Sequence, residues 1–491
     1  MPQPDITSAR ARLRAIARRA MSEHGLQPDI PAAAMAQADS PTPTPTSATS
    51  DVRDLRALLW CSIDNDDSRD LDQLTVADEP VNSTFARVLV AVADVDALVP
   101  QRSPIDDHAR INTTSVYTPA QIFPMLPERL STDLTSLVED EDRPAIVVEM
   151  HLTAEGVIHQ FSMYRAIVRN HAKLAYNGVA AWLDGRAAPP APLAAVPGLD
   201  DCLRLQDRIA GSMRSQRQAH GALTLASTEA HAVFDGDAIA GLEPDTKNRA
   251  KTLIEDFMIG ANGVAAAFLS KHGRSSIRRV LRAPRRWDRI VQIARELGTT
   301  LPGAPDAAAL DGFLRARRQA DPDRFQDLSL SVVKLLGSGE YTLVRAGARA
   351  DGHFGLAVRD YAHSTAPNRR FPDLITQRLL KAAMAGQPTP YSDADLESLA
   401  AHCTLQEDNA DKVERQVRKS AAALLLSNRR GAHFEAIVTG ASEKGTWVRI
   451  FQPPAEGRVI RGEAGMDVGE RVRVILVDTD VDRGFIDFVR E

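Results

Sequence analysis

The sequence predicts an α+β protein, in which a mixed α/β domain is followed by a small all-β barrel and preceded by a short helical extension. Three observations predict this architecture. Residues 38–50 are rich in Pro and Thr and lack large apolar residues, which is typical of a linker. Buried-strand patterns alternate with amphipathic helices over 51–428. Short alternating stretches separated by Gly and Asp fill 429–491. The predicted units are 1–39 (extension), 40–50 (linker), 51–428 (central domain) and 429–491 (barrel).

Composition limits the class of protein. The 491 residues are 44% hydrophobic and 25% charged, which excludes collagen-like and wholly disordered chains. A formal net charge of −6 excludes a polycationic coat but leaves room for a local basic groove. Three widely spaced cysteines exclude a disulfide framework and suit a reducing compartment. Without an apolar run of about 18 residues or a signal-peptide core, we expect a soluble cytoplasmic protein that does not contact a membrane.

The extension is predicted to be helical. Residues 8–24 read as an Arg-rich helix with Ser8 as its N-cap and Gly25 as its end. Residues 31–38 read as a second short helix with Pro31 at its first position. The arginines within 10–19 are candidates for contacts with nucleic-acid phosphates, against the alternative of a solvated face.

The central domain is predicted from its periodicity. Residues 58–63 and 86–95 read as buried strands. Residues 246–271 read as a long helix, because apolar side chains recur there every three or four positions. Further helices are expected from Pro372 to Gly386 and over 392–428. Five short strands within 429–491 favour a Greek-key barrel of the OB type.

An acidic loop is the sharpest feature. Residues 62–74 carry aspartates at Asp64, Asp66, Asp67, Asp70 and Asp72. Carboxylates this dense repel one another unless cations neutralise them, and the apolar flanks draw the loop into a core. Asp70 and Asp72 point to one side in extended backbone. Hard oxygen ligands suit Mg²⁺ or Mn²⁺, whereas Arg69 and Thr75 occupy the places where an EF-hand needs Gly and Glu. A solvated acidic turn is the competing interpretation.

This loop resembles the catalytic signature of the RNase II/RNase R (RNB) family of exoribonucleases. Similar blocks follow in the family's order at 88–100, 116–137, 172–179, 253–262 and 353–380. The resemblance implies an RNB-type catalytic domain with a C-terminal OB-fold RNA-binding domain. It also implies a Mg²⁺-dependent hydrolase that degrades single-stranded RNA from its 3′ end to 5′-mononucleotides.

Catalytic residues carry over from the family by position. Asp64, Asp70 and Asp72 match the metal-binding aspartates. Gln73 stands where the family usually has a further Asp and offers a carbonyl oxygen without charge. Arg369 matches the arginine that stabilises the transition state at the scissile phosphate, just before a helix N-terminus that itself attracts phosphate.

The resemblance also assigns RNA contacts, and each has a structural alternative. The matching residues are Tyr117, Tyr176, Leu225, Glu255, Asn262 and Glu414. The tyrosines match residues that line the catalytic cavity, and Leu225 stands where the family clamps bases with an aromatic ring. Glu255 and Asn262 are seven positions apart on the long helix and share a face, from which the carboxylate is expected to recognise ribose. The alternatives are core tyrosines and a surface glutamate.

The expected partner is the 3′ end of single-stranded RNA, including overhangs of duplex RNA, and a monomer is expected. Residues 271–289 contain seven arginines and are a candidate RNA-guiding surface or a solvated face. Family members usually carry two cold-shock domains before the catalytic domain. Residues 1–50 are too few for one, so we expect an open entrance and digestion of overhangs to a short stub. Two alternatives remain open: a catalytically weak or inactive RNA-binding protein, suggested by Gln73, and a metal phosphodiesterase acting on another nucleic acid.

Overall fold

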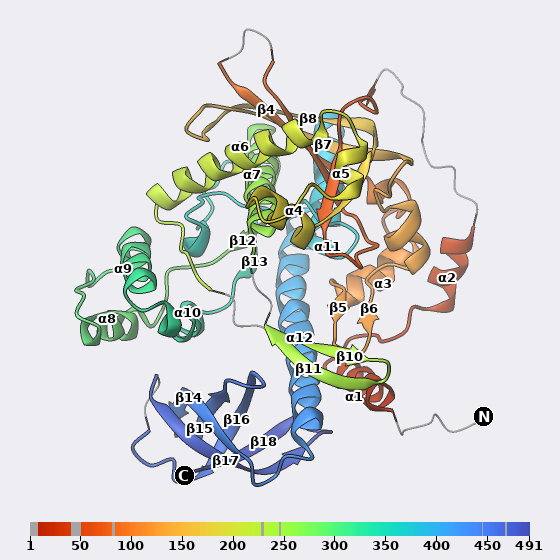
Figure 1. Cartoon of the computed structure of the whole chain (residues 1–491). Coiled ribbons are helices and arrows are strands. Elements are labelled where there is room, and N and C mark those ends of the chain that lie inside the picture. The colour runs from red at the N-terminus through yellow and green to blue at the C-terminus, as the bar shows by residue number, and fades with distance from the viewer. Residues whose placement is uncertain are drawn as a thin grey trace.

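A computed structural model describes residues 8–40, 51–80, 84–226, 230–244, 247–443, 445–466 and 469–491 (Figure 1). Positions 41–50 of the predicted linker lie outside these ranges. The predicted combination of a mixed α/β domain and a closed C-terminal barrel is confirmed.

A seven-stranded mixed sheet forms the centre of the central domain, in the order β1-β8-β7-β4-β3-β2-β9. The strands are β1 (Val52–Asp54), β2 (Cys61–Asp64), β3 (Gln73–Asp78), β4 (Ala86–Ala93), β7 (Asp142–Leu152), β8 (Ile158–Arg169) and β9 (Ala172–Ala175). β3, β4, β7 and β8 pair antiparallel, whereas β2 pairs with β9 in parallel. The strand expected at 58–63 begins later, because Trp60 is buried in a turn and its indole donates to the Leu55 carbonyl.

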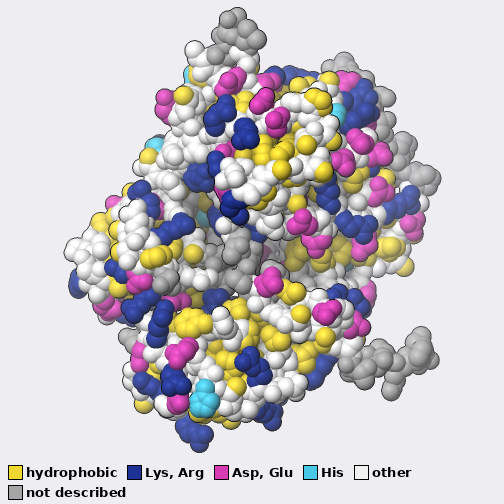
Figure 2. Space-filling model, in the orientation of Figure 1, with side chains coloured by type: hydrophobic (Ala, Val, Ile, Leu, Met, Phe, Trp, Pro, Cys, Tyr) yellow, Lys and Arg dark blue, Asp and Glu magenta, His cyan; other side chains and the backbone are white. Residues whose placement is uncertain are grey.

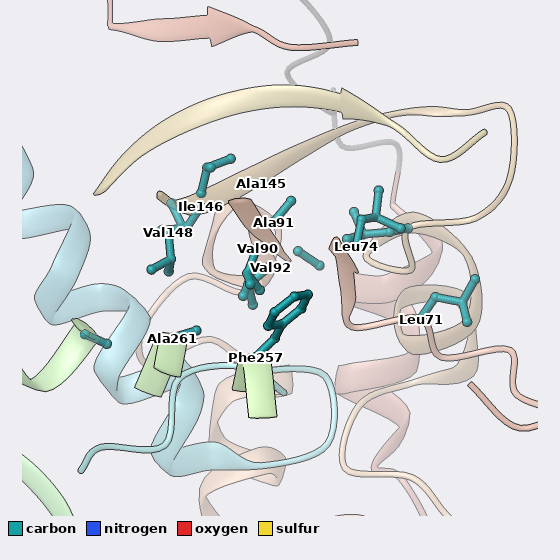
Figure 3. Close-up of a cluster of buried hydrophobic side chains, with 14 of the residues drawn as sticks. Leu71, Leu74, Val90, Ala91, Val92, Ala145, Ile146, Val148, Phe257 and Ala261 are labelled. Atoms are coloured by element: carbon teal, nitrogen blue, oxygen red, sulfur yellow. The ribbon is translucent and has the colours of Figure 1, made fainter. Parts of the chain in front are cut away.

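Helix α7 (Arg249–Lys271) packs against this sheet. It begins three residues later than predicted, where the Asn248 side chain accepts a hydrogen bond from the Lys251 N–H. In Figure 3 the fully buried Phe257 ring lies beside Val90 and Val92 of β4. The helix is long and apolar enough to cross a membrane, but 72% of its most apolar window is buried inside the protein, which is typical of a core helix.

Further helices surround the sheet and form a second lobe. They are α3 (Pro104–Asn112), α4 (Tyr176–Leu183), α5 (Ala191–Ala195), α6 (Leu199–Ala219), α8 (Trp287–Glu296), α9 (Ala307–Ala320), α10 (Pro322–Leu336), α11 (Phe371–Met384) and α12 (Asp393–Leu426). Helices α8 to α10 share a hydrophobic cluster of their own and form the lobe on the left of Figure 1. Two small strand pairs complete the domain: β5 (Val116–Tyr117) with β6 (Ile122–Phe123), and β12 (Ser276–Val280) with β13 (Glu340–Val344).

The long helix α12 connects the central domain to the barrel (Figure 1). It starts at a capping box in which Ser392 and Asp395 satisfy each other's backbone N–H groups. The closed barrel has the order β14-β15-β16-β18-β17, as five strands in this region predicted. Its strands are β14 (His433–Ser442), β15 (Gly445–Ile450), β16 (Ala455–Arg461), β17 (Arg471–Asp480) and β18 (Phe485–Arg490).

The predicted N-terminal helix is present as α1 (Ala9–Glu23), and the Ser8 side chain caps it by accepting from the Ala11 N–H. In α2 (Ala32–Asp39), Pro31 is the N-cap rather than the first helical residue. The apolar face of α1 belongs to the same buried cluster as α12 and the barrel core. The extension is therefore part of the packed structure.

The α1 arginines contact groups of the protein, and their contact with nucleic-acid phosphates stays a prediction. Arg12 forms an ion pair with Asp482 of the barrel at 2.9 Å. Arg14 donates to the Ala120 carbonyl at 3.2 Å. Arg10 lies over the ring of Phe234, in the hairpin of β10 (Ala230–Asp235) and β11 (Ala238–Pro244). Burial of the apolar face brings the neighbouring arginines against protein acceptors, where they fasten α1 to three segments.

Candidate active site

The acidic loop connects β2 to β3, and its conformation is fixed by the buried Leu71. The Leu71 side chain is 3% exposed and lies in the core (Figure 3). Its N–H donates to Ser136 Oγ at 2.9 Å, and its carbonyl accepts from the Leu137 N–H at 2.9 Å. Because Leu71 points into the core, its neighbours Asp70 and Asp72 point away from it. One apolar side chain thus sets the direction of two carboxylates.

Asp72 is the most buried carboxylate of the loop, with a side chain that is 3% exposed. Its Oδ1 accepts from the main-chain N–H of Asn368 at 3.1 Å, and its Oδ2 accepts from Arg369 Nε at 3.1 Å. Burial raises the pKa of Asp72 to about 7, against the opposing effect of Arg369 and with a further rise from Asp70. Asp72 is therefore a desolvated acceptor next to another carboxylate.

Asp64, at the end of β2, belongs to the same electrostatic cluster. Its Oδ1 accepts from the Asn65 N–H at 2.7 Å and from Ser68 Oγ at 2.9 Å. Burial raises the pKa of Asp64, and the Asp70 carboxylate raises it further. Asp66 and Asp67 are exposed, which agrees with solvated turn residues.

The donor set fits a divalent cation. Across the described residues, no three His, Cys, Asp or Glu side chains already converge on one point. Protein donors instead occupy the carboxylates, with Arg369 on Asp72 and the Tyr117 hydroxyl on Asp70 at 3.3 Å. The three carboxylates repel one another, and two of them, Asp64 and Asp72, have raised pKa values. A hard divalent cation bound between them would neutralise this repulsion. Gln73 is half-buried at the first position of β3 and stays a predicted ligand.

Arg369 contacts both Asp72 and the segment just before β5, the strand that carries Tyr117. Its carbonyl accepts from the Ser115 N–H at 3.0 Å and from Thr114 Oγ1 at 3.2 Å, two and three residues before Tyr117. Burial alone would lower the pKa of Arg369, but the Asp72 carboxylate holds it above the ordinary value. The neighbouring Arg370 pairs at 2.8 Å with the fully buried Asp373.

Both predicted tyrosines lie at the carboxylates. The Tyr117 hydroxyl donates to Asp70, and its main-chain N–H donates to Glu414 Oε1 at 2.8 Å. Tyr176 is the first residue of α4, where burial raises its pKa and the nearby Asp64 raises it further. The structure thus brings together residues that lie far apart in sequence, and it gives Glu414 a contact with the Tyr117 backbone.

Leu225 and Glu255 line a separate cleft of about 1000 Å³ between α6, α7 and α10. Glu255 forms an ion pair with Lys247 at the cleft wall. Asn262 does not join them. It is 2% exposed, donates to the Tyr361 hydroxyl and accepts from the Ser364 N–H at 2.8 Å. The prediction that Asn262 contacts RNA is therefore wrong, since its amide holds the loop that leads to Arg369.

The basic stretch 271–289 is divided between the interior and the surface, and only part of it is available for the predicted RNA-guiding role. Arg278 is 1% exposed and pairs with Asp360. Arg279 pairs with Glu407, and Arg282 pairs with Glu340 and Asp351. Trp287 is buried, with its indole donating to the Pro302 carbonyl. Strand β12 places Arg278 and Arg279 opposite acids from other elements, so these two stabilise the fold. The exposed side chains of Lys271, Arg285 and Arg286 stay predicted contacts for RNA.

Sequence reasoning missed a basic region between the barrel, the β10–β11 hairpin, α10 and α12. One cavity there is lined by the cationic side chains of Lys334, Arg415, Arg418, Lys419 and Arg449, together with Pro119 and Glu456. A wider cleft of about 870 Å³ shares Arg449 and adds Arg429, Arg471 and the 39% exposed Phe451. Figure 2 shows positive and negative side chains mixed over the visible face, with a hollow above the barrel. The cations come from α10, from α12 and from residues 429–471, so they gather when these segments pack together.

Comparison with known proteins identifies the catalytic domain. The family model of the RNB domain matches residues 52–386, well over half of the chain. The chain belongs to the RNB family. A second model, of the RNase II-type exonuclease C-terminal S1 domain, matches residues 432–491, which is the barrel. The resemblance inferred from the acidic loop is thereby confirmed.

Named relatives agree with this assignment. Ribonuclease R of Escherichia coli K12 is 30% identical over 473 residues, covering 89% of this chain and 57% of the relative. Ribonuclease R of Vibrio parahaemolyticus is 30% identical over 421 residues, covering 83% and 49% respectively. The chain thus spans about half the length of the curated relatives it matches. The structure of Mycoplasma genitalium RNase R in complex with ribose-methylated single-stranded RNA has a TM-score of 0.88 at 21% identity, covering 99% of this chain and 78% of that chain, and it supports the fold.

Proposed function

We propose that this protein is a hydrolytic 3′-to-5′ exoribonuclease that degrades single-stranded RNA to 5′-mononucleotides with Mg²⁺, or Mn²⁺ in its place. One observation carries the proposal: Asp72 and Arg369 face each other at 3.1 Å beside Asp64 and Asp70, with Tyr117 and Tyr176 against the same carboxylates. Carboxylates, a guanidinium and two aromatic side chains lie beside one another, a combination that suits cleavage of a phosphodiester at a strand end.

Asp64, Asp70 and Asp72, with Gln73 beside them, would hold the metal. When bound, Mg²⁺ supplies a water of lowered pKa and neutralises charge on phosphate oxygens. Arg369 is 41% exposed, so its guanidinium can reach a phosphate while its carbonyl stays anchored to Ser115. Its charge stabilises the negative charge that develops in the transition state. Tyr117 and Tyr176 orient the terminal nucleotides by stacking on the bases.

The RNA upstream of the cut is proposed to follow the basic clefts at the barrel. Phe451 offers a stacking surface, with the Arg471 guanidinium 5.5 Å from its ring centroid. Arg415 and Arg418 line the adjoining cavity, which reaches Pro119, two residues beyond Tyr117. Cations that follow a backbone and an exposed ring suit single strands without regard to sequence. Leu225 and Glu255 are proposed to contact the terminal nucleotides from their own cleft, with Glu255 accepting from a ribose 2′-OH.

An inactive RNA-binding protein is the second candidate, because the fold also occurs in yeast Ssd1, described as a pseudonuclease. That structure has a TM-score of 0.72 at 17% identity, covering 91% of this chain and 55% of that chain. Asp64, Asp70, Asp72 and Arg369 are all present in this chain, which favours catalysis. We also propose that the protein acts in the cytoplasm as a monomer, as its reduced, buried cysteines suit.

The test compares 5′-labelled single-stranded RNA and DNA of one sequence, each with Mg²⁺ or EDTA. The proposal expects a ladder of shortened RNA with Mg²⁺ only, intact DNA, and no products from Asp72→Asn. RNA that stays intact but binds the protein would favour the pseudonuclease, and degraded DNA would favour a phosphodiesterase of different specificity.

A further inference from the structure

Two adjacent polar residues, Thr135 and Ser136, contact both loops that form the reaction site. Ser136 Oγ accepts from the Leu71 N–H at 2.9 Å and donates to the Arg69 carbonyl at 2.7 Å, on the acidic loop. Thr135 bonds to Asn368, which directly precedes Arg369. One short segment therefore touches the loop that carries Asp72 and the loop that carries Arg369.

The contact between Thr135 and Asn368 is double and fully buried. Thr135 Oγ1 lies 2.5 Å from Asn368 Oδ1, and Asn368 Nδ2 donates to the Thr135 carbonyl at 2.9 Å. Asn368 is 1% exposed and Thr135 is 4% exposed. The Thr135 hydroxyl also lies 2.8 Å from the Leu130 carbonyl and has one proton for these two acceptors. The bond from Asn368 Nδ2 to the Thr135 carbonyl, together with the close contact between Oγ1 and Oδ1, holds the plane of the Asn368 amide.

The main chain of Asn368 contacts Asp72, whereas its side chain contacts Thr135. With its side chain held by Thr135, its N–H donates to Asp72 Oδ1 at 3.1 Å. The next residue, Arg369, donates from Nε to Asp72 Oδ2 at 3.1 Å. By holding this loop, the side chain of Asn368 helps to position both groups that donate to Asp72, the Asn368 N–H and Arg369 Nε.

We propose that Thr135 and Asn368 form a positioning pair that sets the relative placement of Asp72 and Arg369. The inference rests on the proposed function, and it assigns these residues no contact with RNA. Without this pair, the Arg369 loop and the acidic loop would still fold, but the distance and orientation between the Asp72 carboxylate and the Arg369 guanidinium would change. A displacement of about 1 Å between reacting groups costs up to about 100-fold in rate.

The decisive variants are Thr135→Val, which removes the hydroxyl at constant shape, and Thr135→Ser, which keeps it. We expect Thr135→Val to lower kcat by about tenfold or more with KM within about threefold, and Thr135→Ser to retain kcat within about threefold. Asn368→Leu should match Thr135→Val, and the double variant should lose little more than either single one, since both remove the same contact.

The matched control is Asn112→Leu. Asn112 is also 1% exposed and also bonds twice to one residue, accepting from the Gln27 N–H at 2.8 Å and donating to the Gln27 carbonyl at 2.9 Å. Both of these hydrogen bonds are made to Gln27 of the N-terminal extension, and neither involves Asp72 or Arg369. We expect Asn112→Leu to lower the melting temperature about as much as Asn368→Leu while kcat stays unchanged.

A readout without RNA separates this inference from the proposed function. Mn²⁺ affinity of the free protein, measured by electron paramagnetic resonance, should fall in Thr135→Val and hold in Thr135→Ser and Asn112→Leu, because the pair orients Asp72. Equal kcat and equal Mn²⁺ affinity in the Val and Ser variants would overturn the inference, even if Asn368→Leu failed to fold. Loss of kcat in Asn112→Leu to the same degree would overturn it as well. An inactive wild-type protein would refute only the proposed function, since the Mn²⁺ comparison still reads the orientation of Asp72.

Discussion

Removing Arg369 should damage stability and activity by two separable routes. Arg369→Ala leaves the 3% exposed Asp72 carboxylate without its charged partner, retaining only the Asn368 N–H. Breaking a fully buried pair costs about 3–5 kcal/mol. Because the Arg369 side chain is 41% exposed, solvent screening reduces that cost, and we expect about 1–3 kcal/mol. Each kcal/mol corresponds to about 2–4 °C in melting temperature for a domain of this order of size.

The double variant Asp72→Asn/Arg369→Ala separates the two routes. The amide that replaces the Asp72 carboxylate carries no charge, so the double variant should recover about 1–2 kcal/mol relative to Arg369→Ala. Hydrolysis should stay lost in the double variant, because both the metal ligand and the guanidinium are gone. Recovery of stability without recovery of activity would assign Arg369 a chemical role beyond neutralising Asp72.

The assay is thermal unfolding in EDTA at pH 8.5, where Asp72 is ionised, beside single-turnover digestion of RNA with Mg²⁺. Asp72→Asn alone completes the cycle. The reasoning would be refuted if Arg369→Ala melted like the wild type, or if the two substitutions lowered the melting temperature additively, since either result means that the side chains do not interact.

Four further outcomes follow from the structure. Tyr117→Ala should weaken binding of RNA in EDTA by about 1–3 kcal/mol, whereas Tyr117→Phe keeps the ring and should bind like the wild type; equal losses in a filter-binding assay would exclude stacking. Phe451→Ala should weaken binding of long RNA more than of tetranucleotides, as read by anisotropy, and a uniform loss would contradict an upstream site. Leu13→Ala, at a fully buried position of α1, should destabilise the protein by about 2–5 kcal/mol in urea unfolding, whereas an unaffected midpoint would mean that α1 is not part of the core. Burial and Arg279 lower the pKa of His353 to about 4, so the contribution of His353 to stability should be nearly complete above pH 6.5 and fall by about 2 kcal/mol by pH 5; the stability profile of His353→Gln should differ from that of the wild type by this amount, and profiles of the same slope would exclude the contribution.

Local pattern predicted the elements well where one residue decides the boundary. Ser8 as the N-cap of α1 and the five strands of the barrel are examples. Periodicity also found α7, whose apolar face packs on the sheet. The start of β2 was misplaced, because the buried turn at Trp60 continues the apolar run without continuing the strand.

Charge was harder to interpret than apolar pattern, because an arginine's role depends on what faces it. The arginines of β12 and α1 form equally basic runs, yet acids and carbonyls from distant segments engage them. The barrel shows the converse. Its ten basic and eleven acidic side chains suggest no binding surface, but Arg449 and Arg471 gather with Arg429 beside Phe451 when the barrel closes against its neighbours.

In the candidate site, too, some residues could be predicted from the sequence and others could not. The aspartates, Arg369 and both tyrosines were assigned by resemblance, and the structure brings them together. The roles of Asn368, Thr135 and Ser136 could not be predicted, because they arise from contacts across 233 and 65 positions of sequence separation. Asn262 was misassigned for a related reason: a shared helix face does not reveal which side chain meets the Ser364 loop.

The most direct test of the central claim follows the first nucleotide released from RNA labelled at its 3′ terminal phosphodiester. With Mg²⁺ and excess enzyme, the account predicts that the label appears as a 5′-mononucleotide in the first turnover, while a 5′ label on the same RNA stays in fragments that shorten stepwise. Release of the 5′ label first, or internal fragments carrying the 3′ label, would contradict the account.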